Sequence, residues 1–154
     1  MDLQSIRERI LATPLVSSLP EEMRQRYVMM LLWISQTESV SRETILFKQG
    51  EKDAGTGCLI LEGMVRIIAD EREVKTIEAP DILGEVQLFT PQGTRTATVE
   101  VVVGGEVLKF EWDALGNIMR EFYTDEEFAA MKKMIAQSAW TREENLAEKL
   151  RTRG

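Results

Sequence analysis

The stretch GEVQLFTPQGTRTATV, residues 84–99, places a carboxylate and a guanidinium on either side of a short loop that contains proline and glycine. Gly84 allows backbone N–H groups to converge on an anion, and Arg95 offers planar, paired donors that suit a phosphate. Glu85 can only accept hydrogen bonds when ionised, so it suits a hydroxyl donor. Together these groups fit a ribose phosphate. A plain Glu85–Arg95 ion pair within a loop is the alternative that the two residues leave open.

Composition limits the kinds of partner this chain can have. The 154 residues are 44% hydrophobic and 29% charged, which is typical of one globular domain with a proper core. The net charge is −7, so we expect neither direct binding to nucleic acid nor binding to an anionic membrane. A local positive pocket for a small anion remains compatible with this charge.

The absence of some residue types excludes several chemistries. The sequence has no histidine and one cysteine, Cys58, which excludes histidine catalysis and an internal disulfide and argues against a metal site. A hydrolytic or metal-dependent enzyme is therefore not expected. The longest apolar run, YVMMLLWI (27–34), is too short to span a bilayer, and the first residues lack the pattern of a leader, so we expect neither a membrane span nor a leader segment. We expect a cytoplasmic protein.

The N-terminal segment, residues 1–38, has the spacing of helices. Ser18 and Glu21 form a capping-box pattern, with Pro20 in the expected first turn. Apolar residues then recur at helical spacing and predict one buried stripe. Its members are Met23, Tyr27, Met30, Leu31 and Ile34.

Residues 39–112 have the pattern of a β domain. Short runs rich in β-branched residues alternate with turn signals, which predicts a small antiparallel barrel or sandwich. Gly104 and Gly105 lie between two such runs and predict a tight hairpin. The segment ILGEVQLF (82–89) breaks the alternation and fits a single helical turn. The expected fold is thus mainly β with flanking helices.

The C-terminal segment, residues 113–154, is helical again in its pattern. TDEE (124–127) and TREE (141–144) each place a threonine three residues before a glutamate, so each can start a helix. Phe128, Met131 and Ile135 would face inward from the first, and Leu146 and Leu150 from the second. The sequence leaves open whether this segment forms one helix or two.

The β segment resembles the cyclic nucleotide-binding domain family in an ordered set of short motifs. The matching stretches are ETILFKQGEKDAGTGCLILEGMVRI (43–67), DILGEVQLF (81–89) and RTATV (95–99). The resemblance covers about residues 40 to 112, and the flanking helices fall where that family has them. It implies a single domain, residues 1–154, built as an antiparallel jelly-roll barrel with N-terminal and C-terminal helices.

The resemblance also implies a site and a non-enzymatic role. Residues 84–96 would form a phosphate-binding cassette in which Arg95 pairs with the cyclic phosphate and Glu85 accepts from the ribose 2′-OH. The ligand would be cAMP or cGMP, and Thr96 beside the arginine leaves room for a guanine. Gly84 would open the cassette, and further backbone N–H groups would come from residues near Val86, Gln87 and Thr96.

Other residues are candidates for the pocket wall and for a cap over the base. Ile67, Val74 and Leu83 occupy positions that resemble the wall, although ordinary core packing explains each of them equally well. Trp140 and Thr141 fall where the family's C-terminal helix covers the base. The alternative for Trp140 is packing against the barrel.

Two departures from the family pattern support a second hypothesis. Gln87 stands where a small residue is usual, and Pro80 replaces a usual glycine before Asp81. The alternative function is therefore a protein-interaction or scaffold domain with a degenerate nucleotide pocket. In the leading hypothesis the C-terminal helices move on binding and are recognised by a protein effector or by a second copy in a homodimer.

Overall fold

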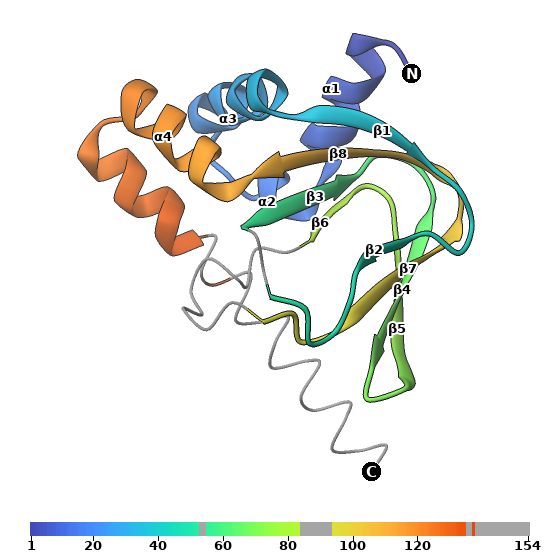
Figure 1. The fold of residues 1–154 in the computed structure, drawn as a ribbon. Coiled ribbons are helices and arrows are strands. Elements are labelled where there is room, and N and C mark those ends of the chain that lie inside the picture. The colour runs from blue at the N-terminus through green and yellow to red at the C-terminus, as the bar shows by residue number, and fades with distance from the viewer. Residues whose placement is uncertain (53–54, 84–93, 135–136, 138–154) are drawn as a thin grey trace.

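Two four-stranded antiparallel sheets face each other, with helices covering one of them (Figure 1). The structure is a computed structural model that describes residues 1–52, 55–83, 94–134 and 137. The first sheet has the order β1 (Gln36–Val40), β8 (Gly105–Glu111), β3 (Thr56–Ile60) and β6 (Asp81–Leu83). The second has the order β2 (Ile45–Phe47), β7 (Thr98–Val103), β4 (Met64–Ala69) and β5 (Arg72–Glu78).

The expected mainly β fold with flanking helices is confirmed. Among the described residues no named strand pairs with strands of both sheets, so the two sheets of the roll do not close into a true barrel. Each of the sequence runs that predicted the β domain overlaps a strand: ETILF (43–47), GCLILE (57–62), MVRIIA (64–69), EVKTIEA (73–79), TATVEVVV (96–103) and EVLKFEW (106–112). Each strand contributes short antiparallel pairings, such as Cys58 opposite Lys109 between β3 and β8.

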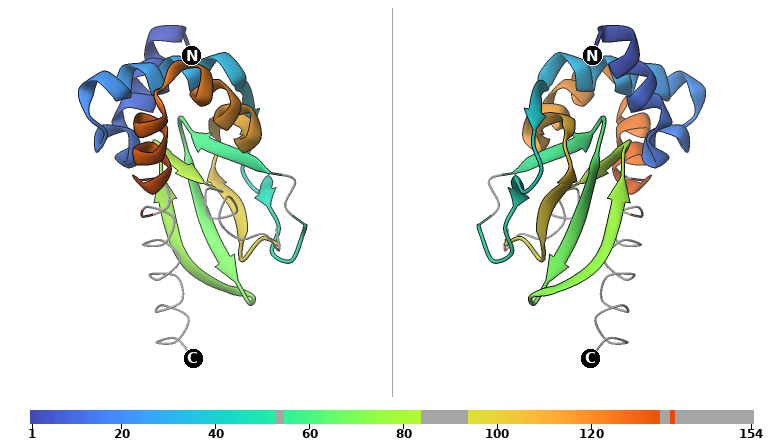
Figure 2. Two further views of the ribbon diagram at one scale, coloured as in Figure 1. Left: turned by 90° about the vertical axis from the view of Figure 1, so that its left-hand side faces the viewer. Right: turned by 90° about the vertical axis from the view of Figure 1, so that its right-hand side faces the viewer.

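Four named helices and one further helical stretch gather at one end of the molecule, over the first sheet (Figures 1 and 2). They are α1 (Leu3–Ala12), α2 (Pro14–Ser17), α3 (Glu21–Ile34) and α4 (Trp112–Phe122), and residues 125–134 are also helical. The predicted stripe of α3 is confirmed, because Met23, Tyr27, Met30 and Leu31 are buried and Ile34 is partly buried.

The predicted capping box at Ser18 is wrong. The Ser18 hydroxyl donates to the carbonyl of Leu15 at 2.6 Å, because Ser18 ends α2 instead of starting α3. Pro20 is the N-cap residue of α3, and no side chain caps that terminus among the described contacts.

The second capping box is confirmed: Thr124 N–H donates to Glu127 Oε1 at 3.0 Å, and Glu127 N–H donates to Thr124 Oγ1 at 3.2 Å. The predicted box at 141–144 lies outside the described residues, as does the choice between one C-terminal helix and two.

The predicted hairpin at Gly104 and Gly105 is also wrong. These residues connect β7 to β8, which belong to different sheets, so the chain crosses the roll at this point instead of folding back within one sheet. Gly105 begins β8 opposite Val40, and a Cβ on Gly105 would lie 2.1 Å from the Glu62 carbonyl oxygen. A glycine is therefore required by close approach of two backbone segments and not by a hairpin turn.

The first sheet separates two hydrophobic cores. Its outer face packs against the helices, with Leu59, Leu61 and Leu108 in that core. Its inner face packs against the second sheet, with Cys58, Ile60 and Val107 in that core. Strand β3 therefore has buried side chains on both faces.

One glycine of β3 accommodates two aromatic rings. A Cβ on Gly57 would lie 2.6 Å from the ring of Phe110 and 2.8 Å from the indole of Trp112. These two rings meet edge to face with centroids 4.8 Å apart, an arrangement that aromatic pairs favour. Gly57 thus lets β3 lie against the start of α4.

None of the helices in the described ranges combines the length and apolar character of a membrane span.

Candidate functional site

The backbone of Arg95 is fixed by the loop that follows β2. Its N–H donates to the Glu51 carbonyl at 2.9 Å, and its carbonyl accepts from the Gly50 N–H at 2.9 Å. A bridge between Lys52 and Thr94 extends this pairing. Gly50 has a φ of 84°, a conformation that glycine adopts without strain. One segment that is distant in the sequence therefore holds the backbone of Arg95 through both its N–H and its carbonyl.

The side chain of Arg95 is buried between a ring and a strand. It is 8% exposed, its guanidinium carbon lies 3.9 Å from the centroid of the Phe47 ring, and its Nη2 donates to the Thr56 carbonyl at 2.9 Å. Stacking and hydrogen bonding together orient the planar group, which has donors on three nitrogens. Such an oriented guanidinium is well suited to bind a phosphate.

Arg95 lines a cavity of about 250 Å³ between the two sheets. The cavity contains both charged and apolar groups, as expected for a small ligand with an anionic end. Its other described lining residues come from β2, the loop after β2, β3 and β8. They are Leu46, Phe47, Glu51, Lys52, Thr56, Cys58 and Lys109.

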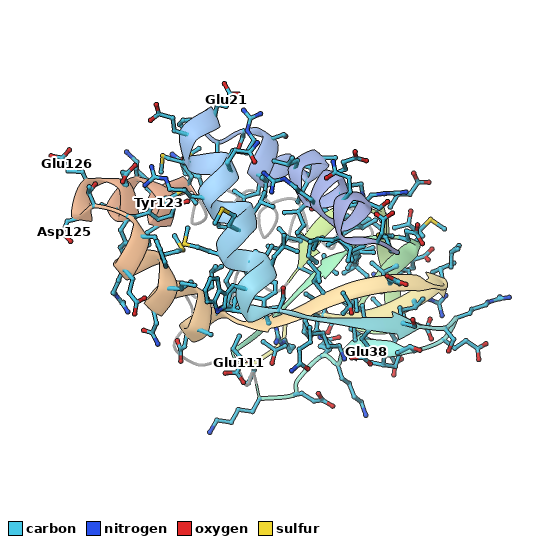
Figure 3. All side chains as sticks on the ribbon, turned by 90° about the horizontal axis from the view of Figure 1, so that it is seen from above. Glu21, Glu38, Glu111, Tyr123, Asp125 and Glu126 are labelled. Carbon is cyan, nitrogen blue, oxygen red and sulfur yellow. The ribbon has the colours of Figure 1, made fainter. Side chains whose placement is uncertain are left out.

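Lys109 adds a cation from β8 to Arg95 and Lys52. It lies opposite both Gln36 of β1 and Cys58 of β3, which places it on the inner face of the first sheet. Its Nζ lies 2.9 Å from Oε2 of Glu38 on β1. Figure 3 shows Glu38 on β1 beside β8. Lys109 and Thr56 also line a neighbouring cavity of about 350 Å³.

Cys58 contributes a neutral group to the cavity wall. Burial raises the pKa of its thiol to about 12, while the nearby cations Lys109 and Arg95 act in the opposite direction. The thiolate is therefore scarce at neutral pH, and Cys58 is not placed to act as a nucleophile.

The predicted site residues have different positions in the structure. Arg95 lies at the cavity, and Thr96 directly after it is exposed. Ile67 and Leu83 belong to the inner core and Val74 is buried, and none of the three lines the cavity among its described residues. Their role as a pocket wall stays a prediction.

The remaining predicted site residues lie outside the described residues. They are Gly84, Glu85, Val86, Gln87, Trp140 and Thr141. Their assigned contacts with a phosphate, a ribose and a base stay predictions. The helical turn expected at residues 82–89 is wrong for its first two residues, which end strand β6, and the rest of it lies outside the described residues.

Sequence reasoning predicted only Arg95 among the described residues that line the cavity and missed seven others, which include Phe47, Thr56 and Lys109. Phe47 was part of the motif but was not expected to stack on Arg95. Thr56 and Lys109 were not considered. The alternation of β3 and β8 could have indicated them, because Thr56, Cys58 and Lys109 share the inner face.

Comparison with known proteins agrees with this architecture. The family model for the cyclic nucleotide-binding domain matches residues 37–122, more than half of the chain. The chain therefore belongs to the cyclic nucleotide-binding domain family. A search of curated proteins found no match.

Several solved structures have the same fold. PKAR CBD2 bound to Sp-2Cl-cAMPS has a TM-score of 0.71 at 15% identity, covering 94% of this chain and 92% of that one. A cyclic nucleotide-binding domain from Methylobacillus flagellatus KT has a TM-score of 0.71 at 18% identity, covering 98% and 83%. The sensor domain of the transcriptional regulator DNR from Pseudomonas aeruginosa has a TM-score of 0.65 at 18% identity, covering 88% and 91%. At these identities the likeness concerns the fold alone.

Proposed function

We propose that this domain is a non-enzymatic cytoplasmic sensor that binds cAMP or cGMP in the cavity beside Arg95. The main observation in support is that the guanidinium of Arg95 is buried and oriented at that cavity. Arg95 would bind the cyclic phosphate and Glu85 the ribose 2′-OH. Gly84, Val86, Gln87 and Thr96 would supply the surrounding backbone.

The family membership and the electrostatics both support this ligand class. PKAR CBD2, which shares the fold, binds the cyclic nucleotide analogue Sp-2Cl-cAMPS. The chain carries a net charge of −7, and yet the described lining of the cavity has three cations, Lys52, Arg95 and Lys109, against one carboxylate, Glu51. A local cluster of cations in an acidic protein favours a small anion over an extended polyanion.

Strand β8 connects the cavity to the helices, so it can transmit the effect of ligand binding. It carries Lys109 at the cavity, and α4 begins three residues later at Trp112. A ligand that binds one arrangement of β8 and α4 more tightly would shift the population toward that arrangement. The moved helical surface would then be recognised by a protein effector or by a second copy of the chain.

Calorimetric titration with cAMP and with cGMP tests the binding proposal. Arg95→Ala removes a charge-assisted contact worth about 1.5–3 kcal/mol, which corresponds to roughly a ten- to hundredfold loss of affinity. Arg95→Lys keeps the charge but loses the planar donors, and should show an intermediate loss. The matched control is Arg66→Ala, which removes an arginine of β4 paired with Glu100 of β7, outside the cavity lining.

Circular dichroism and thermal melts separate a folding defect from a binding defect. This check is needed because Arg95 also contacts Thr56 and Phe47. Micromolar binding that Arg95→Ala weakens and Arg66→Ala leaves intact supports the proposal. Binding of neither nucleotide by the folded parent refutes it.

A protein-interaction domain with a degenerate pocket is the second candidate. The observation in its favour is an exposed apolar pair on α3, Met29 and Trp33, four residues apart on one face, with Trp33 76% exposed. This candidate predicts a folded parent that gives no heat with either nucleotide. Met29→Gln and Trp33→Gln should then weaken partner binding without changing the fold.

A further inference from the structure

Lys109 lies at the cavity of Arg95 while its ammonium group is paired elsewhere. Its Nζ contacts Glu38 of β1 at 2.9 Å, and Glu38 is not among the described residues that line the cavity. The Lys109 and Glu38 side chains are 39% and 50% exposed. The pair is therefore partly exposed to solvent, and Lys109 is the member that also lines the cavity.

Cys58 lines the same cavity as Arg95 and Lys109. Lys109, Glu38 and Arg95 all act on the pKa of its thiol. The thiol itself is neutral at ordinary pH and offers no charge to any of them. Arg95 and Lys109 are two of the three cations among the described residues that line the cavity, and Glu38 pairs with Lys109.

The contacts of the two cations differ in strength. Arg95 is fixed by Phe47 and Thr56, whereas Lys109 is held by a partly exposed ion pair. Exposed ion pairs contribute little to stability, because water and salt screen them and because ordering two long side chains costs entropy. A lysine ammonium on its flexible stem can turn from one acceptor to another with its three donors.

We propose that Lys109 exchanges Glu38 for the anionic group of the ligand and becomes a second cationic contact beside Arg95. This inference rests on the proposed function and adds an affinity-determining ion pair to the same site. Lys109 strengthens the binding of a small phosphate-bearing anion, and Glu38 weakens it by competing for the ammonium group. The affinity of the site for the anion consequently depends on the competing carboxylate of Glu38 on β1.

Four variants and a salt series test this exchange by calorimetry with the nucleotide that the parent binds. Lys109→Gln should lower the affinity about three- to tenfold, whereas Glu38→Gln should raise it about threefold because the competing carboxylate is lost. The double variant should match Lys109→Gln, since Glu38 acts only through Lys109. Lys109→Arg keeps the charge and should retain most of the affinity.

The control removes a comparable carboxylate from an ion pair outside the cavity. Glu100 of β7 pairs with Arg66 on the second sheet, so Glu100→Gln should leave the affinity unchanged. Raising the salt concentration from about 50 to 300 mM should weaken binding more in the parent than in Lys109→Gln, because the variant has lost one partly exposed charge contact. A purely structural effect of Lys109 would not change this salt dependence.

The outcomes distinguish this inference from the function on which it rests. If the parent binds and Arg95→Ala loses binding, while Lys109→Gln and Glu38→Gln both match the parent, the exchange is wrong and the sensor function stands. If Glu38→Gln lowers the affinity as much as Lys109→Gln does, the pair is structural and the exchange is wrong. If the folded parent binds neither nucleotide, both proposals fail together.

Discussion

Arg26 of α3 pairs with Glu127, the residue that closes the capping box at the start of the helical stretch 125–134. Its Nη1 donates to Glu127 Oε1 at 3.2 Å and to the Phe122 carbonyl, the end of α4, at 3.1 Å. The guanidinium also lies 4.8 Å from the ring centroid of Tyr123, whose hydroxyl donates to the Met23 carbonyl at 2.9 Å. One arginine therefore connects α3 with the end of α4 and with the helical turn that follows. Figure 3 shows Tyr123 directed toward α3, with Asp125 and Glu126 at the periphery.

Glu127→Gln should make the protein less stable at neutral pH and equally stable in acid. The hydrogen bond from Arg26, followed by the one from the Thr124 backbone, lowers the pKa of the Glu127 carboxyl below its usual 4.5. A lowered pKa gives stability that is complete above the unfolded value and is lost as the pH falls through the folded value. The melting temperature of the variant should lie below that of the parent at pH 7, and the gap should close as the pH falls below about 4.

Glu126→Gln is the control for this pH series, because it changes the neighbouring exposed carboxylate on the same helical turn. It should melt like the parent throughout the series. A gap between Glu127→Gln and the parent that persists unchanged at pH 3 would contradict the role given to the Arg26–Glu127 pair.

Cys58 should resist thiol reagents in the folded protein. With its pKa raised to about 12 from the usual 9.0, the thiol holds roughly a thousandfold less thiolate at pH 8 than an exposed cysteine. Labelling with an aromatic disulfide, followed by absorbance, should be slow in buffer and fast in concentrated urea. Rapid labelling of the folded protein would show that the cavity wall opens far more often than its burial indicates.

Gly105→Ala should destabilise the roll. The added Cβ would lie 2.1 Å from the Glu62 carbonyl oxygen, a backbone atom that cannot move away on its own. The expected loss is about 1–3 kcal/mol in the free energy of unfolding, measured by urea denaturation. Gly116→Ala, on α4 with open space around its Cβ position, should instead stabilise by about 0.5–1 kcal/mol. Equal effects of the two substitutions would be inconsistent with the close approach at Gly105.

Met131→Ala should detach the helical stretch 125–134 from the core. Met131 is fully buried in the helix-side core, where Phe128 and Met134 pack at its edge. Removing a buried side chain of this size costs about 2–5 kcal/mol, which urea denaturation can measure. Lys132→Ala, at the next and exposed position, should have little effect. A loss below about 1 kcal/mol for Met131→Ala would mean that this stretch contributes little to the core.

The sequence predicted those parts of the fold that have a strong local pattern. Strands β3, β4, β7 and β8 have dense β-branched or apolar runs, and each appears where expected. Strand β1 was missed and fell partly within the segment expected to be helical, because Gln36–Val40 is mostly exposed and has no apolar alternation. Strand β6 has only three residues, too few for a periodic signal.

Two local signals failed because tertiary structure overrode them. The Gly104–Gly105 pair has the composition of a hairpin, but which sheet each neighbouring strand joins depends on distant partners such as Val40. Ser18 has the spacing of a cap, but the preceding turn of α2 occupies its hydroxyl. Neither competing contact can be read from a window of a few residues.

The site could be predicted at Arg95 and not at the residues around it. Arg95 stands within a recognisable motif, whereas Lys109 reaches the cavity only through the pairing of β8 with β3. Glu38 lies on a strand that had no recognisable pattern. Site residues contributed by strand register, unlike those within one loop, require knowledge of which strands are neighbours.

The contact of Gly57 with Phe110 and Trp112 has a consequence for how β3 finds its alignment. Cys58, Leu59, Ile60 and Leu61 are buried in succession on alternate faces, so a shift of one residue would still bury an apolar side chain at each point. Hydrophobic alternation normally fixes the register of a strand, but in β3 it distinguishes poorly between the correct register and one shifted by a residue. A shifted strand would, however, place a Cβ where the two aromatic rings leave room only for hydrogen. Gly57, which has no side chain, therefore fixes the register of β3.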